Sequence, residues 1–224
     1  MTANIVNTGG AIPTRRPFVK VSAFVDWNSQ LLLTSIPCEQ EPLTAARTAF
    51  QQVTRRIARR LADISEQMYF QVSLRLYHGW RKGYEPTLNL KAIRQVISET
   101  DFPSLSERSN VTYSSNIGYG DCLISALPRR LHAKIAIHLP NTCRDRGFKG
   151  HEEKMVDTAM AADTVVCAYQ DPEDWIIMVG EDDDLVPPLF TAEAIISSRG
   201  AKALLISQRT RGNNFLLLDG LDAR

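Results

Sequence analysis

Four consecutive acids, Glu181 to Asp184, follow an apolar run at residues 175–179, with only Gly180 between. The apolar run predicts a buried strand, so the acids are expected where that strand ends. Like charges held this close repel one another, and a bound cation would relieve that repulsion. Hard divalent cations such as Mg2+ prefer oxygen ligands, which carboxylates supply. We therefore interpret the acid run as part of a cation site.

Two further acids stand at comparable positions. Asp26 ends an apolar segment at 18–26, and Asp157 lies near the start of a helix expected at 152–169. In parallel sheets, functional groups gather beyond the carboxyl ends of the strands. If the first and fourth strands are neighbours, three chain segments bring carboxylates to one edge. The expected metal ligands and catalytic residues are Asp26, Asp157, Asp182 and Asp184.

Cations held in this way can align water for in-line attack on a phosphodiester. The competing interpretation is that the acids only cap a helix, since Asp at a first turn accepts backbone N–H groups. One Asp would suffice for a cap, and four exceed that need.

The elements that must position these acids follow from hydrophobic periodicity. Strands are expected at 18–26, 69–77, 133–139, 174–180, 201–207 and 214–218, and helices at 41–67, 88–99, 152–169 and 188–199. The helix at 152–169 should bury the stripe Met155, Ala159, Ala162, Val166 and Tyr169. This alternation predicts an α/β fold with three layers, a mostly parallel sheet flanked by helices.

The helix at 41–67 has an arginine-rich face opposite its apolar stripe. We expect this face to be solvated rather than to grip RNA. Its residues are Arg55, Arg56, Arg59 and Arg60.

The length of 224 residues suits one domain. We expect a flexible arm at 1–16 and a domain at 17–224 with an insertion at about 100–131, which shows no clear period. Such a segment in a compact domain is often functional. Contact with a protein partner, or with a second copy of the chain, is expected through this insertion.

The composition excludes several classes of protein. A net charge of +1 provides no global basic field for nucleic acid, so RNA contact requires local patches. The four cysteines form no CxxC pair, which favours free thiols in a reducing compartment. No apolar run is long enough to cross a bilayer, and the N-terminus lacks the apolar stretch of a signal peptide. We expect a cytoplasmic protein with no membrane contact.

Three motifs, in order, resemble those of the NYN-domain family of PIN-like metal-dependent ribonucleases. The stretch "FVDWNSQ" has Asp26 followed by Asn28, and "EKMVDTAMAAD" has Lys154, Asp157 and Asp163. The third motif is the strand followed by "EDDDLVP", which aligns with the family's Gly-Asp-Ser-Asp-Phe-x-Pro-Leu.

This third motif departs from the family pattern at several positions. Glu181 takes the Gly position, Asp183 the Ser position and Leu185 the Phe position, and an extra Pro precedes Leu189. The stretch between the second strand and Lys154 is also longer than usual.

The resemblance implies a PIN-like, Rossmann-like fold that hydrolyses RNA with Mg2+ or Mn2+. Residues expected just outside the ligand set are Asn28, Asp163 and Asp183. Asp157 and Asp163 lie six residues apart and point ~120° apart on a helix. We therefore favour Asp157 as the ligand and Asp163 as an outer-shell group or a structural polar contact.

Phosphate contact is expected from the basic residues around the start of the helix at 152–169. Gly147 and Gly150 there allow close backbone approach. The expected RNA-binding residues are Arg144, Arg146, Lys149 and Lys154.

Three alternatives remain open. A haloacid-dehalogenase-like phosphatase would need a second Asp where this chain has Asn28, and a toprim-type nuclease would need Glu where it has Asp26. The third is a catalytically inactive NYN-like scaffold that binds RNA or a protein.

Overall fold

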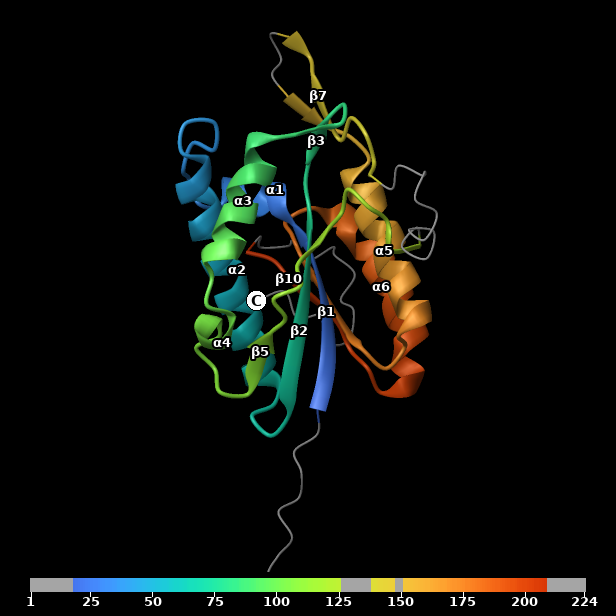
Figure 1. The fold of residues 1–224 in the computed structure, drawn as a ribbon. Coiled ribbons are helices and arrows are strands. Elements are labelled where there is room, and N and C mark those ends of the chain that lie inside the picture. Colours follow the sequence, from blue (N-terminus) through green and yellow to red (C-terminus); the bar gives the residue numbers. More distant parts are fainter. Residues whose placement is uncertain (1–17, 126–137, 148–150, 209–224) are drawn as a thin grey trace, which may run out of the picture.

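A parallel sheet with helices on both faces forms the molecule (Figure 1). The computed structural model describes residues 18–125, 138–147 and 151–208. The sheet order is β10-β9-β1-β2-β5, and β6 also pairs with β2. Its strands are β1 (Phe18–Asp26), β2 (Tyr69–Tyr77), β5 (Val111–Tyr113), β6 (Gly118–Tyr119), β9 (Trp175–Val179) and β10 (Ala203–Ile206). The expected α/β class with a parallel sheet is confirmed.

The helices form two outer layers. Figure 1 shows α2, α3 and α4 on one side of the sheet and α5 and α6 on the other. The helices are α1 (Trp27–Leu32), α2 (Pro42–Ile64), α3 (Leu88–Glu99), α4 (Phe102–Leu105), α5 (Val156–Gln170) and α6 (Val186–Ile196). Two 3-10 turns, η3 (Asp183–Leu185) and η4 (Ser197–Arg199), flank α6.

Local sequence explains where several of these elements lie. Every residue of β9 is buried, as expected of an apolar run that lies between two neighbouring strands. Pro42 opens α2, where the missing N–H is not needed. The Thr87 side chain accepts a hydrogen bond from the backbone N–H of Leu90 and caps α3.

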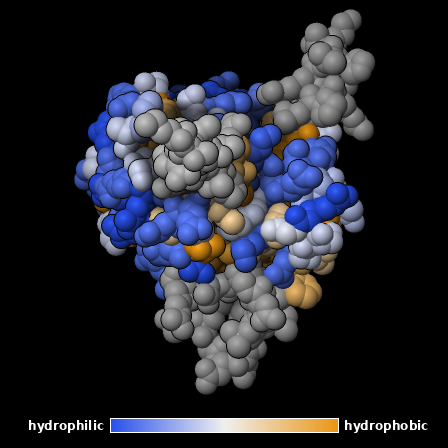
Figure 2. Space-filling view, turned by 90° about the horizontal axis from the view of Figure 1, so that it is seen from below, coloured by the Kyte–Doolittle hydropathy of each residue, from blue (hydrophilic) through white to orange (hydrophobic). Residues whose placement is uncertain are grey.

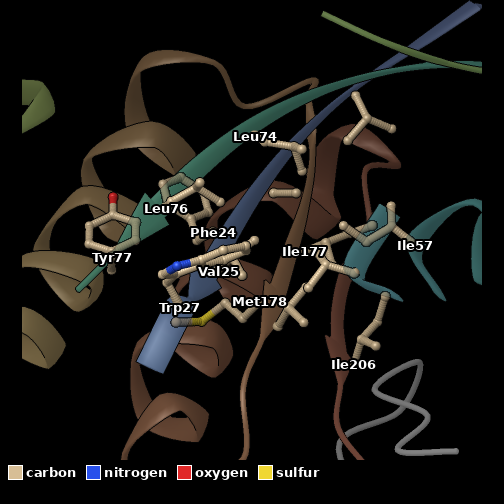
Figure 3. Close-up of a cluster of buried hydrophobic side chains, with 14 of the residues drawn as sticks. Phe24, Val25, Trp27, Ile57, Leu74, Leu76, Tyr77, Ile177, Met178 and Ile206 are labelled. Atoms are coloured by element: carbon tan, nitrogen blue, oxygen red, sulfur yellow. The ribbon is translucent and has the colours of Figure 1, made fainter. Parts of the chain in front are cut away.

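The core fills the space between the sheet and its helices. The close-up in Figure 3 shows buried side chains from β1, β2, β9, β10, α1 and α2 meeting in one cluster. Its labelled members are Phe24, Val25, Trp27, Ile57, Leu74, Leu76, Tyr77, Ile177, Met178 and Ile206. Trp27 follows Asp26 directly and is fully buried, so its role is packing.

Two antiparallel hairpins lie outside the main sheet. One pairs β3 (Arg81–Lys82) with β4 (Glu85–Pro86), and the other pairs β7 (Cys143–Asp145) with β8 (His151–Glu153). In Figure 1 both lie above the end of the sheet at which β1 and β2 finish. Two hairpins from segments far apart in the sequence, β3–β4 and β7–β8, therefore lie at the carboxyl edge of the sheet.

The start of α5 was predicted wrongly. Residues 151–153 form β8, and the helix begins at Val156 because Met155 adopts a left-handed backbone with φ 65°. The predicted stripe was also wrong, since Met155 and Tyr169 are exposed. The helix instead buries Val156, Ala159, Met160, Asp163, Thr164, Cys167 and Ala168. The polar Asp163 can lie on this face because three donors satisfy it, as shown below.

Part of the expected insertion at 100–131 is described. Its residues 100–125 include α4, the edge strand β5 and the short strand β6. The expected arm at 1–16, most of the strand at 133–139 and the strand at 214–218 lie outside the described residues.

Cys38, Cys122, Cys143 and Cys167 are free. Among the described residues, no helix combines the length and apolar character needed to cross a membrane. Figure 2, which views the molecule from below, shows a largely hydrophilic surface with small apolar spots where the described residues are visible.

Candidate metal centre at the carboxyl edge

Asp26 is the last residue of β1 and also the N-cap of α1. Its Oδ1 accepts a hydrogen bond of 3.3 Å from the backbone N–H of Ser29, and the Ser29 hydroxyl donates to the Asp26 carbonyl at 3.0 Å. Burial raises the pKa of Asp26 from 3.8 to about 6, with smaller increases from the charges of Glu153 and Asp157. The hydrogen bonds from Ser29 lower the pKa but do not offset burial.

The strand that precedes the acid run is the direct neighbour of β1. Val25 pairs with Val179 in a parallel register, so Asp26 and Gly180 follow side by side. A Cβ built at Gly180 would lie 3.1 Å from the Asp26 Cβ and 2.3 Å from the Leu185 Cδ1. Glycine therefore allows the acid run to lie against Asp26. The condition that the first and fourth predicted strands be neighbours is met.

Within the acid run, the four carboxylates have different surroundings. Asp182 caps η3 by accepting a 3.0 Å hydrogen bond from the backbone N–H of Asp184, and both side chains are exposed. Glu181 instead accepts from the Ser207 hydroxyl at 2.8 Å and from the backbone N–H of Gln208 at 3.0 Å. Glu181 thus ties the end of β9 to the end of β10. Capping therefore explains Asp182, and the hydrogen bonds between the ends of β9 and β10 explain Glu181.

Asp157 lies in the first turn of α5, beside the acid run. Burial raises its pKa, and the charges of Asp182, Glu153 and Asp184 raise it further. The same Asp157 charge acts on Asp26. Carboxylates from β1, α5 and the turn after β9 are therefore electrostatically coupled at one edge of the sheet. Their mutual repulsion is the physical setting in which a divalent cation is favourable.

Glu153, at the end of β8, is a member of this group that the sequence analysis missed. It raises the pKa of both Asp26 and Asp157. Its Oε1 contacts the His78 Nδ1 and accepts from the backbone N–H of Gly79, directly after β2. The Asn89 Nδ2 contacts the other ring nitrogen of His78 at 2.6 Å. The sequence signal was weak, because Glu153 appears only as one acid in a charged stretch before Lys154.

The residues expected just outside the ligand set divide into two groups. Asn28, in α1, and Asp183, in η3, lie on the same short elements as Asp26 and Asp184. Asp163 is buried and engaged elsewhere.

Three donors from separate segments satisfy the Asp163 carboxylate. It accepts from the Arg75 Nε at 2.9 Å, the Tyr77 hydroxyl at 2.8 Å and the backbone N–H of Ile124 at 2.7 Å. These bonds join α5 to β2 and to the segment after β6. Asp163 is thus the structural polar contact that the sequence analysis gave as one of its two possibilities.

The basic residues expected to bind RNA belong to the β7–β8 hairpin and its continuation. Arg144 pairs with Glu152 in the hairpin register, and Arg146 forms an ion pair with the Glu152 carboxylate. The Lys154 Nζ lies 3.1 Å from the same carboxylate. Glu152 therefore offsets part of this positive charge. Lys149 lies outside the described residues.

The carboxylates do not form a closed cage in this structure. Among residues 18–125, 138–147 and 151–208, no three His, Cys, Asp or Glu side chains lie close enough together to enclose a metal ion. The donors present at the edge are carboxylate oxygens, which match a hard cation.

Comparison with known proteins returned no match from protein-family models, curated proteins or solved structures.

Proposed function

We propose that this protein is a metal-dependent ribonuclease that hydrolyses RNA phosphodiester bonds. The observation that carries this proposal is that β1, the turn after its neighbour β9 and the first turn of α5 bring carboxylates to one sheet edge, where burial and the neighbouring charges raise the pKa values of Asp26 and Asp157. The resemblance to the NYN-domain family points to the same residues. One or two Mg2+ or Mn2+ ions would be held by Asp26, Asp157, Asp182 and Asp184. The proposal requires these side chains to close around the ion, since no three acids in the described residues lie close enough to enclose it.

A bound divalent cation would supply Lewis acidity and neutralise negative charge on the substrate phosphate. The chain's own residues position this chemistry. Asp26 is fixed by its cap on α1, and Asp182 by its hydrogen bond to the Asp184 backbone. Gly180, which has no side chain, lets the two segments approach closely. Asn28, two residues after Asp26 in α1, would orient a ligand or a water.

Ionisation of Asp26 sets the pH range in which the four carboxylates can bind a cation. With a pKa of about 6, Asp26 is protonated at pH 5 and ionised at pH 7.5 in the absence of a cation. Cation binding requires the ionised form and so displaces a proton near pH 6. Cation affinity is therefore expected to fall as the pH drops below 6.

The free thiols of the four cysteines support a reducing compartment. We include cytoplasmic location in the proposal on this ground.

A hydrolysis assay tests the proposal directly. Labelled RNA, labelled DNA and p-nitrophenyl phosphate are each incubated with the protein and Mg2+ or Mn2+, and with EDTA. We expect cleavage of RNA that requires the cation and that Asp182→Asn reduces at least about a hundredfold, since Asn keeps the cap but removes the charge.

Asp101→Asn is the matched control, because Asp101 is an exposed N-cap of α4, away from the acid group. It should cleave RNA like the wild type. Release of p-nitrophenol without RNA cleavage would point to a phosphatase, and RNA binding without cleavage to a scaffold. Either result would contradict the proposal.

A further inference from the structure

Arg56 differs from the arginines beside it on α2. Arg55 and Arg59 are exposed, as expected of a solvated face, whereas Arg56 is largely covered. Its Nη2 donates to the Gln30 Oε1. Its Nε and Nη1 are buried, and neither has a hydrogen-bond partner in the part of the chain that the structure describes. The prediction of a solvated arginine face therefore holds for Arg55 and Arg59, whereas Arg56 and Arg60 are half-buried.

A chain of hydrogen bonds connects Arg56 to the candidate metal centre. Gln30 is buried in α1 and its Nε2 donates to the Ser29 Oγ at 2.7 Å. Ser29 in turn donates to the Asp26 carbonyl, and its backbone N–H to the Asp26 carboxylate. The guanidinium is thus fixed against the same short helix that Asp26 caps.

The charge of Glu181, which precedes Asp182 in the acid run, also acts on Arg56. Burial lowers the pKa of Arg56, and the Glu181 charge opposes this effect. Glu181 immediately precedes Asp182, and its oxygens accept hydrogen bonds from Ser207 and Gln208. Arg56 therefore lies near both the start of α1 and the end of β9, the two places that supply Asp26 and Asp182.

Fold stability does not explain a cation in this position. A buried N–H without an acceptor destabilises a protein by about 1–3 kcal/mol, and a covered charge adds a desolvation penalty. The guanidinium has donors left over on Nε and Nη1, and phosphate is an anion that arginine commonly binds through such donors.

We propose that Arg56 binds a phosphate group of the substrate strand next to the phosphate at the acid group. The identity of the strand as RNA rests on the proposed function, whereas phosphate binding by Arg56 does not require hydrolysis. Arg56 is half-buried as a residue and its Nε and Nη1 are buried, so the proposal requires a change of side-chain rotamer that brings these donors to the surface.

Binding without cleavage tests this proposal separately from the nuclease activity. Fluorescently labelled single-stranded RNA is titrated in EDTA, with no divalent cation, at several salt concentrations. We expect Arg56→Gln to weaken binding about tenfold and to reduce the slope of log affinity against log salt by about 0.7, the loss of one phosphate contact. Arg59→Gln, the exposed neighbour, should stay within about twofold of wild type.

Arg56→Lys keeps the charge but not the planar fork, so its affinity should fall between those of wild type and Arg56→Gln. Inorganic phosphate serves as a second probe. It should raise the melting temperature of wild type and Arg59→Gln but not of Arg56→Gln. If phosphate raises the melting temperature but the wild type does not bind RNA, the site binds free anions. That result would overturn the assignment of the phosphate to a substrate strand.

Unchanged RNA affinity and salt slope in Arg56→Gln would overturn the proposal, whether or not the wild type cleaves RNA. Melting temperatures separate binding from folding. We expect Arg56→Gln to melt within about 4 °C of wild type, a change of about 1 kcal/mol. If both Arg56 variants melt far lower and bind phosphate normally, Arg56 is structural and the proposal fails.

Discussion

At the scale of single residues, the carboxyl of Asp26 combines two roles that oppose each other. It caps α1, which stabilises the fold, and it is ionised in a largely buried position beside other acids, which destabilises it. A group that is unfavourable for stability but suited to a cation is typical of functional sites. The two roles can be separated because Asn caps a helix as well as Asp.

Asp26→Asn should therefore stabilise the metal-free protein at pH 7.5. The native pKa of about 6 exceeds the unfolded value of 3.8, so the native state holds the extra proton between these values and stability falls as the pH rises. The difference between these two pKa values corresponds to about 3 kcal/mol in the free energy of unfolding. Because Asp26 is partly exposed, we expect a gain of about 1–3 kcal/mol. Urea unfolding in EDTA measures it.

Most of this gain should disappear at pH 4, where the native Asp26 is already protonated. The same substitution should abolish cation-dependent cleavage of RNA. A variant that is less stable than wild type at pH 7.5 would contradict this account of Asp26.

Asp163 illustrates the opposite case, an acid that the fold needs. Asp163→Ala leaves Arg75, Tyr77 and the N–H of Ile124 without their acceptor. Leaving a buried charge unpaired destabilises a protein by about 3–5 kcal/mol, and we expect a loss of this size in urea unfolding. Tyr77→Phe, which removes only one donor, should lose about 1 kcal/mol. Equal stability of Asp163→Ala and wild type would show that these bonds contribute nothing.

At the scale of elements, the acid group depends on how closely two strand ends approach. Gly180 is the contact point, since a side chain there meets both Leu185 and Asp26. The β3–β4 and β7–β8 hairpins lie at the carboxyl edge of the sheet, and β8 ends in Glu153.

Gly180→Ala should push the acid run away from Asp26. Overpacking of this kind lowers the free energy of unfolding by about 1–3 kcal/mol. RNA cleavage should also fall, even at temperatures where the variant remains folded. Adding Leu185→Ala removes the nearest clash, at 2.3 Å, and should restore part of the stability in a double-mutant cycle. Additive losses in the cycle would mean that the two side chains do not collide.

The sequence predicted the long elements well and the short ones poorly. The strands at β1 and β2 match their predicted bounds, because nine-residue apolar patterns carry a clear signal. The hairpin strands have two or three residues each, too few for any period. The start of α5 was missed because nothing in the side-chain pattern reveals the left-handed backbone of Met155.

At the scale of the whole molecule, strand order decides whether the acids meet. Sequence motifs placed Asp26 and Asp182 at strand ends, but only the pairing of β1 with β9 makes those ends adjacent. Glu153 and Arg56 could not be found from sequence, since their partners lie on distant segments. His78 and Gly79 hold Glu153, and Gln30 holds Arg56.

The central claim is that these distant carboxylates share one cation. Anomalous diffraction from crystals soaked in Mn2+ at pH 7.5 tests it most directly. We predict a manganese peak among the carboxylates of Asp26, Asp157, Asp182 and Asp184 in wild-type crystals, and its loss in Asp182→Asn crystals. A well-diffracting wild-type crystal without a peak there, or with the only peak elsewhere on the surface, would contradict the account.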